Sequence, residues 1–174
     1  MALTRIGLNQ SINLASNVTG TLPTANGGTG ATSFAATKVL QVVSAEDATE
    51  RSTSSSSFSD IVSASITPSA TSSKILIMYG VVGIRRDNTN GYMTVKIVDG
   101  SGFSKSVGHA MLYTNSTSTL RIGSANGSFL HDANTTSAKT YTVQFNSSGD
   151  SGTVVVGDNG NSKSTITLME IAGW

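Results

Sequence analysis

The chain has 174 residues, a length that suits one compact domain with or without an additional arm. It contains no cysteine, which excludes disulfides, thiolate nucleophiles and thiolate metal sites. Charged residues make up only 12% of the chain and the net charge is +1, so nothing marks a polybasic binder of nucleic acid or of membranes.

The polar character of the chain comes from hydroxyls and amides, with 28 Ser, 23 Thr and 12 Asn. This composition favours a β-rich extracellular or virion-surface protein over a cytosolic enzyme. Short apolar and β-branched runs recur along the chain, which argues against disorder. The sequence shows neither the pattern of a signal peptide nor the run of about 20 apolar residues that a membrane-spanning helix needs.

Residues 1–37 form a first segment with a single charged side chain, Arg5. Pro23, a cluster of glycines and scattered aliphatic residues give this segment neither a helical period nor a long strand alternation. Alone, it cannot bury enough apolar surface to fold. We therefore expect an extended arm that becomes ordered against identical chains or a larger assembly. A flexible leader is the alternative.

From residue 38 onward the pattern predicts β-strands. Alternation is clearest at Asp60–Thr67, Tyr92–Val98 and Thr140–Phe145. The other expected strands are Val39–Val43, Lys74–Ile84, Val107–Tyr113, Thr119–Ile122, Ser128–His131, Thr153–Val156 and Ser164–Ile171. We expect the long strand from Lys74 to bend at Gly80 or Gly83.

Strands spaced by about 8 to 15 residues, with turn signals between them, predict an all-β fold. The expected architecture is an antiparallel, jelly-roll-like β-sandwich over residues 38–174, a knob preceded by the extended arm. Its two sheets must face each other with alternate side chains directed inward. The expected core residues are Ile75, Ile77, Val95, Ile97, Tyr141, Val143, Phe145, Ile166 and Leu168.

The search for catalytic and metal-binding patterns gives little. The two histidines, His109 and His131, accompany no nucleophile elbow and no cluster of metal ligands. Asp87–Asn90 and Asp158–Asn161 are similar to calcium loops but lack the bidentate glutamate, so turn chemistry explains them better. Gly27–Gly30 is not a phosphate loop, because no lysine and no helix follow it. We expect no enzymatic activity, no cofactor and no metal.

One stretch carries a resemblance to a known group of proteins. Residues 20–33 read Gly-Thr-Leu-Pro-Thr-Ala-Asn-Gly-Gly-Thr-Gly-Ala-Thr-Ser. This stretch resembles a segment that recurs in bacteriophage tail fibres and related virion appendages. Ala64–Ile77 and Ser164–Ile171 are similar to structural proteins of phages, especially marine and cyanobacterial ones.

The resemblance implies a homotrimer that docks on other virion proteins of the tail, neck or capsid through its N-terminal part and meets the host with its C-terminal knob. Glycines in the arm would let three chains approach closely. The chain has room for a short arm and one knob only, which favours a short fibre or appendage. The expected docking and oligomerisation residues are Leu22, Pro23, Asn26, Gly27, Gly28, Gly30 and Trp174.

Host recognition is expected in three polar loops, Arg85–Asn90, Asn115–Thr119 and Asn159–Ser162. Asn, Ser and Thr side chains suit hydrogen bonds to sugars, and a tyrosine ring can stack on one. Plain solvent-facing turns are the alternative reading of these loops. The expected ligand-binding residues are Arg85, Asn88, Asn90, Tyr92, Asn115 and Asn159.

The leading interpretation is thus a short trimeric virion fibre that recognises a host-surface glycan, with no nucleic acid as partner and no insertion into a membrane. The alternative is a purely architectural capsid decoration or a connector of head, neck or tail. A polysaccharide depolymerase is a distant third, because nothing in the sequence pairs two carboxylates.

Overall fold

The computed structural model describes residues 38–87, 91–106, 120–149, 152–157, 160 and 162–173. Within these ranges the chain forms strands and no helix. The strands are β1 (Val39–Asp47), β2 (Arg51–Thr53), β3 (Ser59–Ile66), β4 (Lys74–Asp87), β5 (Gly91–Val98), β6 (Ser104–Ser106), β7 (Leu120–Asp132), β8 (Lys139–Gly149), β9 (Thr153–Val156) and β10 (Ser164–Ile171). The predicted arm, residues 1–37, lies outside the described residues and stays a prediction.

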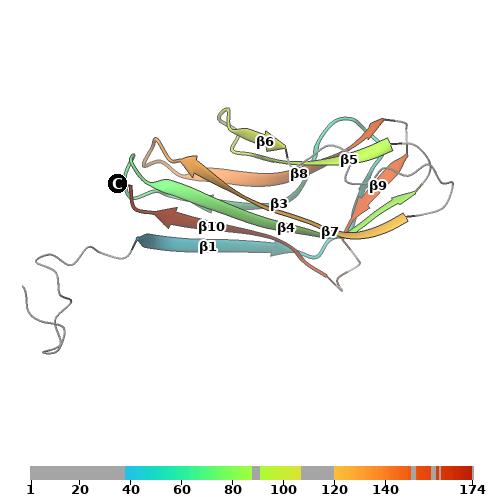
Figure 1. Ribbon diagram of the computed structural model, residues 1–174, viewed down its shortest axis with the longest axis horizontal. Coiled ribbons are helices and arrows are strands. Elements are labelled where there is room, and N and C mark those ends of the chain that lie inside the picture. The colour runs from blue at the N-terminus through green and yellow to red at the C-terminus, as the bar shows by residue number, and fades with distance from the viewer. Residues whose placement is uncertain are drawn as a thin grey trace, which may run out of the picture. The chain divides into compact units, whose positions relative to one another are not determined.

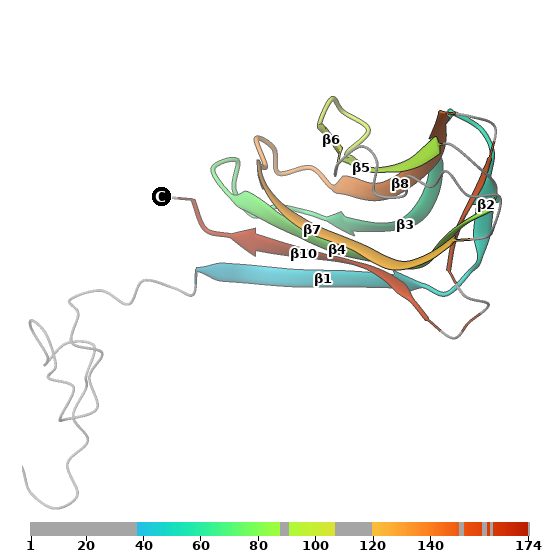
Figure 2. The ribbon, with the colours of Figure 1, turned by 45° about the vertical axis from the view of Figure 1, so that its right-hand side comes forward.

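The strands form two sheets that lie face to face (Figure 1). The four-stranded sheet has the order β3-β8-β5-β6. In the six-stranded sheet β1, β10, β4, β9 and β2 follow one another, and β7 pairs with the other edge of β4. Strand β4 is long enough for β10 to pair with its first half and β9 with its end on one edge, while β7 runs along the opposite edge. Figure 2 shows the two layers from the side.

The pairing is nested in the way that defines a jelly roll. Strand β1 pairs with β10, β3 with β8, β4 with β7 and β5 with β6, all antiparallel. The chain is therefore arranged as one long hairpin whose two arms are rolled up together, and these four pairs fall in alternate sheets. Strands β2 and β9 add a short nested pair to the six-stranded sheet. The predicted jelly-roll-like sandwich is confirmed.

Alternation along the strands places the core between the two sheets. All nine residues that the sequence predicted for the core are fully buried. They are joined by residues that the prediction did not name, among them Val81, Met93 and Val154. Each strand thus contributes alternate side chains to one continuous apolar layer, as a two-sheet architecture requires.

The bend expected in the strand from Lys74 falls at Gly83. Its φ is +63°, a value that glycine tolerates without steric cost. The register with β7 shifts between Val82 and Ile84 and again between Ile84 and Arg85. Gly123 of β7, which pairs with Ile84, also has a positive φ of +92°. The two glycines therefore make an irregularity in the β4–β7 pair, and the strands on either side of it stay paired.

Three details differ from the sequence prediction. Residues 120–132 form one continuous strand, whereas two short strands were expected. In β3 both Ile61 and Val62 are buried, because a bulge after Asp60 interrupts the strict alternation. The short polar strands β2 and β6 were not expected, and the strand expected at Val107–Tyr113 lies outside the described residues.

Candidate functional site

Two of the six predicted ligand-binding residues, Arg85 and Tyr92, belong to the described part of the chain. The rest of the predicted ligand set lies outside it, namely Asn88, Asn90, Asn115 and Asn159. The predicted docking residues Leu22, Pro23, Asn26, Gly27, Gly28, Gly30 and Trp174 lie outside it as well. For these positions the sequence-based assignment stays a prediction.

The strand pairing nevertheless fixes where two of the predicted loops begin and end. Arg86 near the end of β4 pairs with Leu120 at the start of β7. Gly91 at the start of β5 pairs with Gly149 at the end of β8. Of the predicted loop Arg85–Asn90, residues 85–87 belong to strand β4, so the loop prediction is wrong for them. The strand ends Asp87, Gly91 and Leu120, which lie next to segments 88–90 and 107–119, are at one end of the sandwich.

A hollow of about 410 Å³ lies beside the β4–β7 irregularity. Residues 82–85 of β4, Gly123 and Ser124 of β7, and Ser162 line it. The amide of Gly157 donates a 2.9 Å hydrogen bond to the carbonyl of Val82, which holds the connection after β9 against the middle of β4. The fold thereby brings Arg85 and Ser162, from two different predicted recognition loops, to one hollow.

The guanidinium of Arg85 forms two hydrogen bonds with the carboxylate of Glu50. Nη1 donates to Oε2 at 3.0 Å and Nη2 donates to Oε1 at 2.8 Å. Such a bidentate ion pair fixes the plane of the guanidinium and neutralises it. Any ligand of the hollow therefore meets Arg85 as part of an ion pair that links β4 to the segment between β1 and β2.

Tyr92 lies in the other sheet. It is half-buried in β5, opposite Ser148 of β8, and it does not line the hollow beside Arg85. The structure therefore does not join the two described ligand candidates, Arg85 and Tyr92, into one site.

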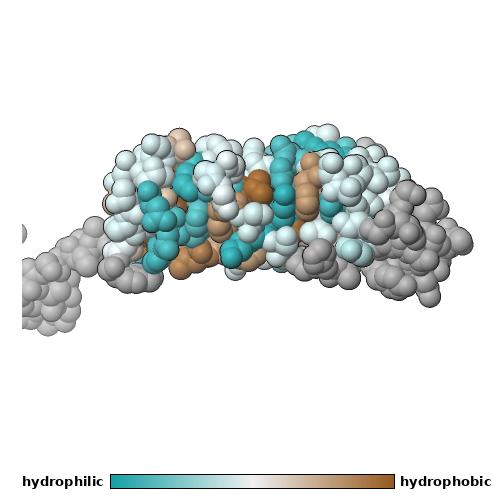
Figure 3. All heavy atoms as spheres, turned by 90° about the horizontal axis from the view of Figure 1, so that it is seen from above, coloured by the Kyte–Doolittle hydropathy of each residue, from teal (hydrophilic) through white to brown (hydrophobic). Residues whose placement is uncertain are grey.

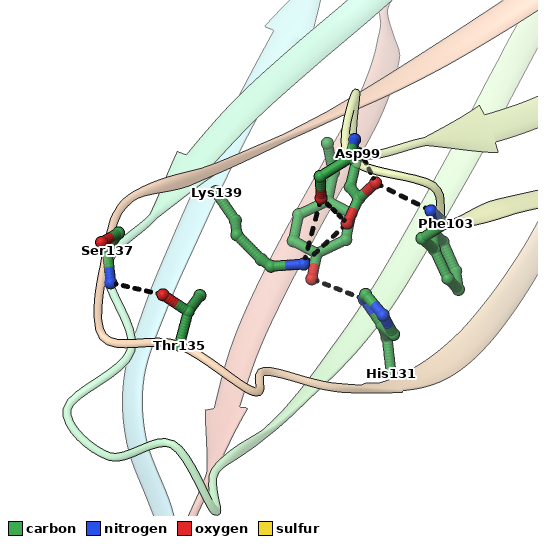
Figure 4. A network of polar contacts seen from close by, with 8 residues as sticks. Asp99, Phe103, His131, Thr135, Ser137 and Lys139 are labelled. Carbon is green, nitrogen blue, oxygen red and sulfur yellow. Dashed lines mark hydrogen bonds and ion pairs between the residues drawn. The ribbon is translucent and has the colours of Figure 1, made fainter.

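A polar cluster at the opposite end of the sandwich was not found from the sequence (Figure 4). The side chain of Asp99, only 1% exposed, accepts hydrogen bonds from Lys139 Nζ at 2.7 Å and Ser101 Oγ at 2.7 Å. The amides of Ser101 and Phe103 donate to its other oxygen. Burial by itself would raise the pKa of Asp99, but the hydrogen bonds from Lys139 and Ser101 outweigh it and hold this pKa well below its usual range.

His131 packs beside this cluster and bonds to a different partner. Its Nδ1 lies 2.9 Å from the Tyr141 hydroxyl, and its ring stacks on Phe103 with 4.1 Å between the ring centroids. Burial, together with the positive charge of Lys139, lowers the pKa of His131. Asp99 bonds to its own turn and to Lys139, whereas His131 bonds to Tyr141. A catalytic triad needs a histidine that is hydrogen-bonded to an aspartate on one side and to a nucleophile on the other, and His131 and Asp99 do not form such a chain. The cluster anchors the β5–β6 turn to β7 and β8.

The residues that the structure describes hold no group of three or more histidine, aspartate or glutamate side chains that could bind a metal. They also include no helix that is long and apolar enough to cross a membrane.

No protein-family model matches the chain. No curated protein matches its sequence. Among solved structures, the chain is similar to the VP2 subviral particle of infectious bursal disease virus, with a TM-score of 0.40 and 13% sequence identity. The match covers 76% of this chain and spans 37% of the VP2 chain. The jelly-roll assignment rests on the strand pairing described above.

Proposed function

We propose that this chain is a structural protein of a virus particle, a short trimeric appendage that attaches to the virion by residues 1–37 and presents its sandwich to a glycan on the host surface. The observation that carries the proposal is the nested strand pairing, because jelly rolls serve as viral capsid and lectin domains. A fold alone does not determine function. The context of a virion fibre comes from the resemblance of residues 20–33 to phage fibre segments.

The strand ends next to two predicted recognition segments support the part of the proposal that concerns the host. Asp87, Gly91 and Leu120, which adjoin segments 88–90 and 107–119, lie at one end of a rigid sandwich. Recognition residues are often carried by loops that a rigid scaffold positions. The proposal assigns no catalytic role to the chain.

Competition for host adsorption tests this part of the proposal. The purified full chain should block adsorption of the phage, and the double variant Asn88→Ala/Asn90→Ala should need at least about tenfold more protein for the same block. Ser63→Ala, on the four-stranded sheet, is the matched control and should block like the unchanged chain. If the unchanged chain does not compete at saturating concentration, the host-binding role is wrong.

One observation favours the architectural alternative, a capsid decoration or connector without host binding. Arg85, predicted to bind ligand, is held in a two-bonded ion pair with Glu50. In the alternative, this ion pair serves to connect β4 to the segment between β1 and β2. In this case the purified chain would bind to virus particles that lack it and would leave adsorption to the host unchanged.

A further inference from the structure

An apolar row crosses the outer face of the six-stranded sheet. Val42 of β1 pairs with Met169 of β10, Met169 pairs with Leu76 of β4, and Leu76 pairs with Leu130 of β7. The side chains beside them in sequence pack on the core, so these four point outward. Val42 is 54% exposed and Leu130 is 52% exposed. Four neighbouring strands thus present one continuous apolar row to the outside.

The outer face of the four-stranded sheet has a different character. A row across it consists of Ser63, Thr142, Val98 and Ser104 in register. The next row pairs Ser65 with Thr140, whose hydroxyls hydrogen-bond at 2.7 Å. Figure 3, which looks onto this side of the molecule, shows mainly residues of intermediate hydropathy and hydrophilic residues, with a few hydrophobic ones between them.

The exposed large apolar residues of the described chain gather on the other sheet. They lie on β1 and β7, at Val39, Leu40, Val42 and Leu130. Covering such surface gains about 25 cal/mol per Å² of apolar area, so a partner that packs on these residues is stabilised by their burial.

The charges around the apolar row favour a second copy of the chain over a charged partner. On the same face Lys74 forms an ion pair with Asp132, and Lys163 forms one with Glu46. Each of these acids is thus paired with a lysine of its own chain, so the four charged groups add no net charge to the face. A charged partner has no complementary charge to meet there, whereas a second copy of the same face meets no repulsion.

We propose that this outer face, centred on Val42, Met169, Leu76 and Leu130, is where a second copy of this chain packs. The inference rests on the proposed virion appendage. A face that packs on its own counterpart joins copies in pairs, so this contact joins copies of two appendages and is separate from the contacts within a trimer. Seven paired residues on four strands give a flat area of about 450 Å². Stable interfaces bury about 800 Å² from each partner. Association through this face is therefore reversible and depends on protein concentration.

Cross-linking through single introduced cysteines tests the surface, since the chain has no cysteine of its own. In the full chain, Val42→Cys and Leu130→Cys should give covalent dimers under mild oxidation or with a short bismaleimide. Ser63→Cys, on the outer face of the four-stranded sheet, is the matched control and should remain uncross-linked. The double variant Val42→Ser/Leu130→Ser should raise the concentration at which copies associate at least about tenfold, measured by sedimentation equilibrium.

Circular dichroism must show an unchanged fold for each variant. We expect this result because the substituted side chains are exposed and not part of the core. Equal cross-linking from both faces, or association that the double variant leaves unchanged, would overturn the assignment of this face and leave the virion role standing. A monomer at every concentration would overturn the self-association itself. The virion role fails on a separate observation, the absence of the protein from purified particles.

Discussion

Glu170 is a carboxylate that the fold removes almost wholly from water. Only 1% of its surface is exposed, and it accepts hydrogen bonds from Gln41 Nε2, from the amide and hydroxyl of Ser69, and from the Ser73 hydroxyl. Burial alone would raise the pKa of Glu170, but the hydrogen bonds from Ser69, Ser73 and Gln41 lower it to about 2. This carboxylate connects β10 to β1 and to the turn between β3 and β4.

Replacing this carboxylate tests its structural role. Glu170→Gln removes the charge and places an amide NH₂ against serine donors, so we expect a loss of about 2 kcal/mol or more in the free energy of unfolding. Urea unfolding measures it. Glu46→Gln is the control, because Glu46 is 57% exposed in its ion pair with Lys163 and should cost well under about 1 kcal/mol. Equal losses for the two variants would contradict the account.

The same carboxylate makes stability depend on pH. Its folded pKa of about 2 lies below the ordinary value of 4.5, so its contribution is present above pH 4.5 and is lost as the pH falls toward 2. Asp99, whose pKa is also lowered, adds to this loss at acid pH. The lowered pKa of His131 adds a loss that begins below pH 6.5. Urea midpoints measured from pH 7 to pH 2 should therefore decrease, and less steeply in Glu170→Gln. A flat profile would contradict these assignments.

At the scale of strands and turns, Gly157 occupies a position that no other residue fits. Its φ is +88°, and a Cβ there would lie 2.7 Å from the carbonyl oxygen of Thr49. Gly160 has nearly the same φ, +89°, with open space around it. Gly160→Ala should cost about 1 kcal/mol from backbone strain alone, and Gly157→Ala should cost clearly more because of the added clash. Thermal unfolding of both variants measures the two losses. An equal or larger loss for Gly160→Ala than for Gly157→Ala would contradict the turn geometry.

The sequence could predict those elements whose apolar residues alternate. Tyr92–Val98 and Thr140–Phe145 alternate without interruption and form the middle of the four-stranded sheet. The strand β7 was expected as two pieces, because the glycines and asparagine of residues 123–127 are typical of a turn. Here pairing with β4 overrides that local preference. Strands β2 and β6 are short and polar, so neither carries the alternation on which strand prediction depends.

The candidate site was less predictable, because its contacts join distant parts of the chain. Arg85 bonds to Glu50, and Lys139 bonds to Asp99, at sequence separations of 35 and 40 residues. No local spacing indicates either pair. Arg85 was expected from its position in a polar loop, whereas its ion pair depends on the pairing of strands that only the folded structure brings together.

For the whole molecule, we propose a sandwich that folds on its own and an arm, residues 1–37, that connects it to the particle. The buried core and both sheets lie within residues 38–173. A chain that lacks residues 1–37 should therefore fold with the same thermal midpoint as the full chain. It should no longer join virus particles, which quantitative mass spectrometry of purified particles measures. Normal incorporation of the shortened chain would show that the arm does not dock it.

The most direct measurement is the location of the protein on intact particles. Antibodies raised against residues 38–174 and carrying gold labels can be imaged on purified phage by electron microscopy. The account predicts labels in clusters at a fixed place on the outside of the tail, neck or capsid. Particles without label, with the protein found only in the soluble fraction of infected cells, would contradict it.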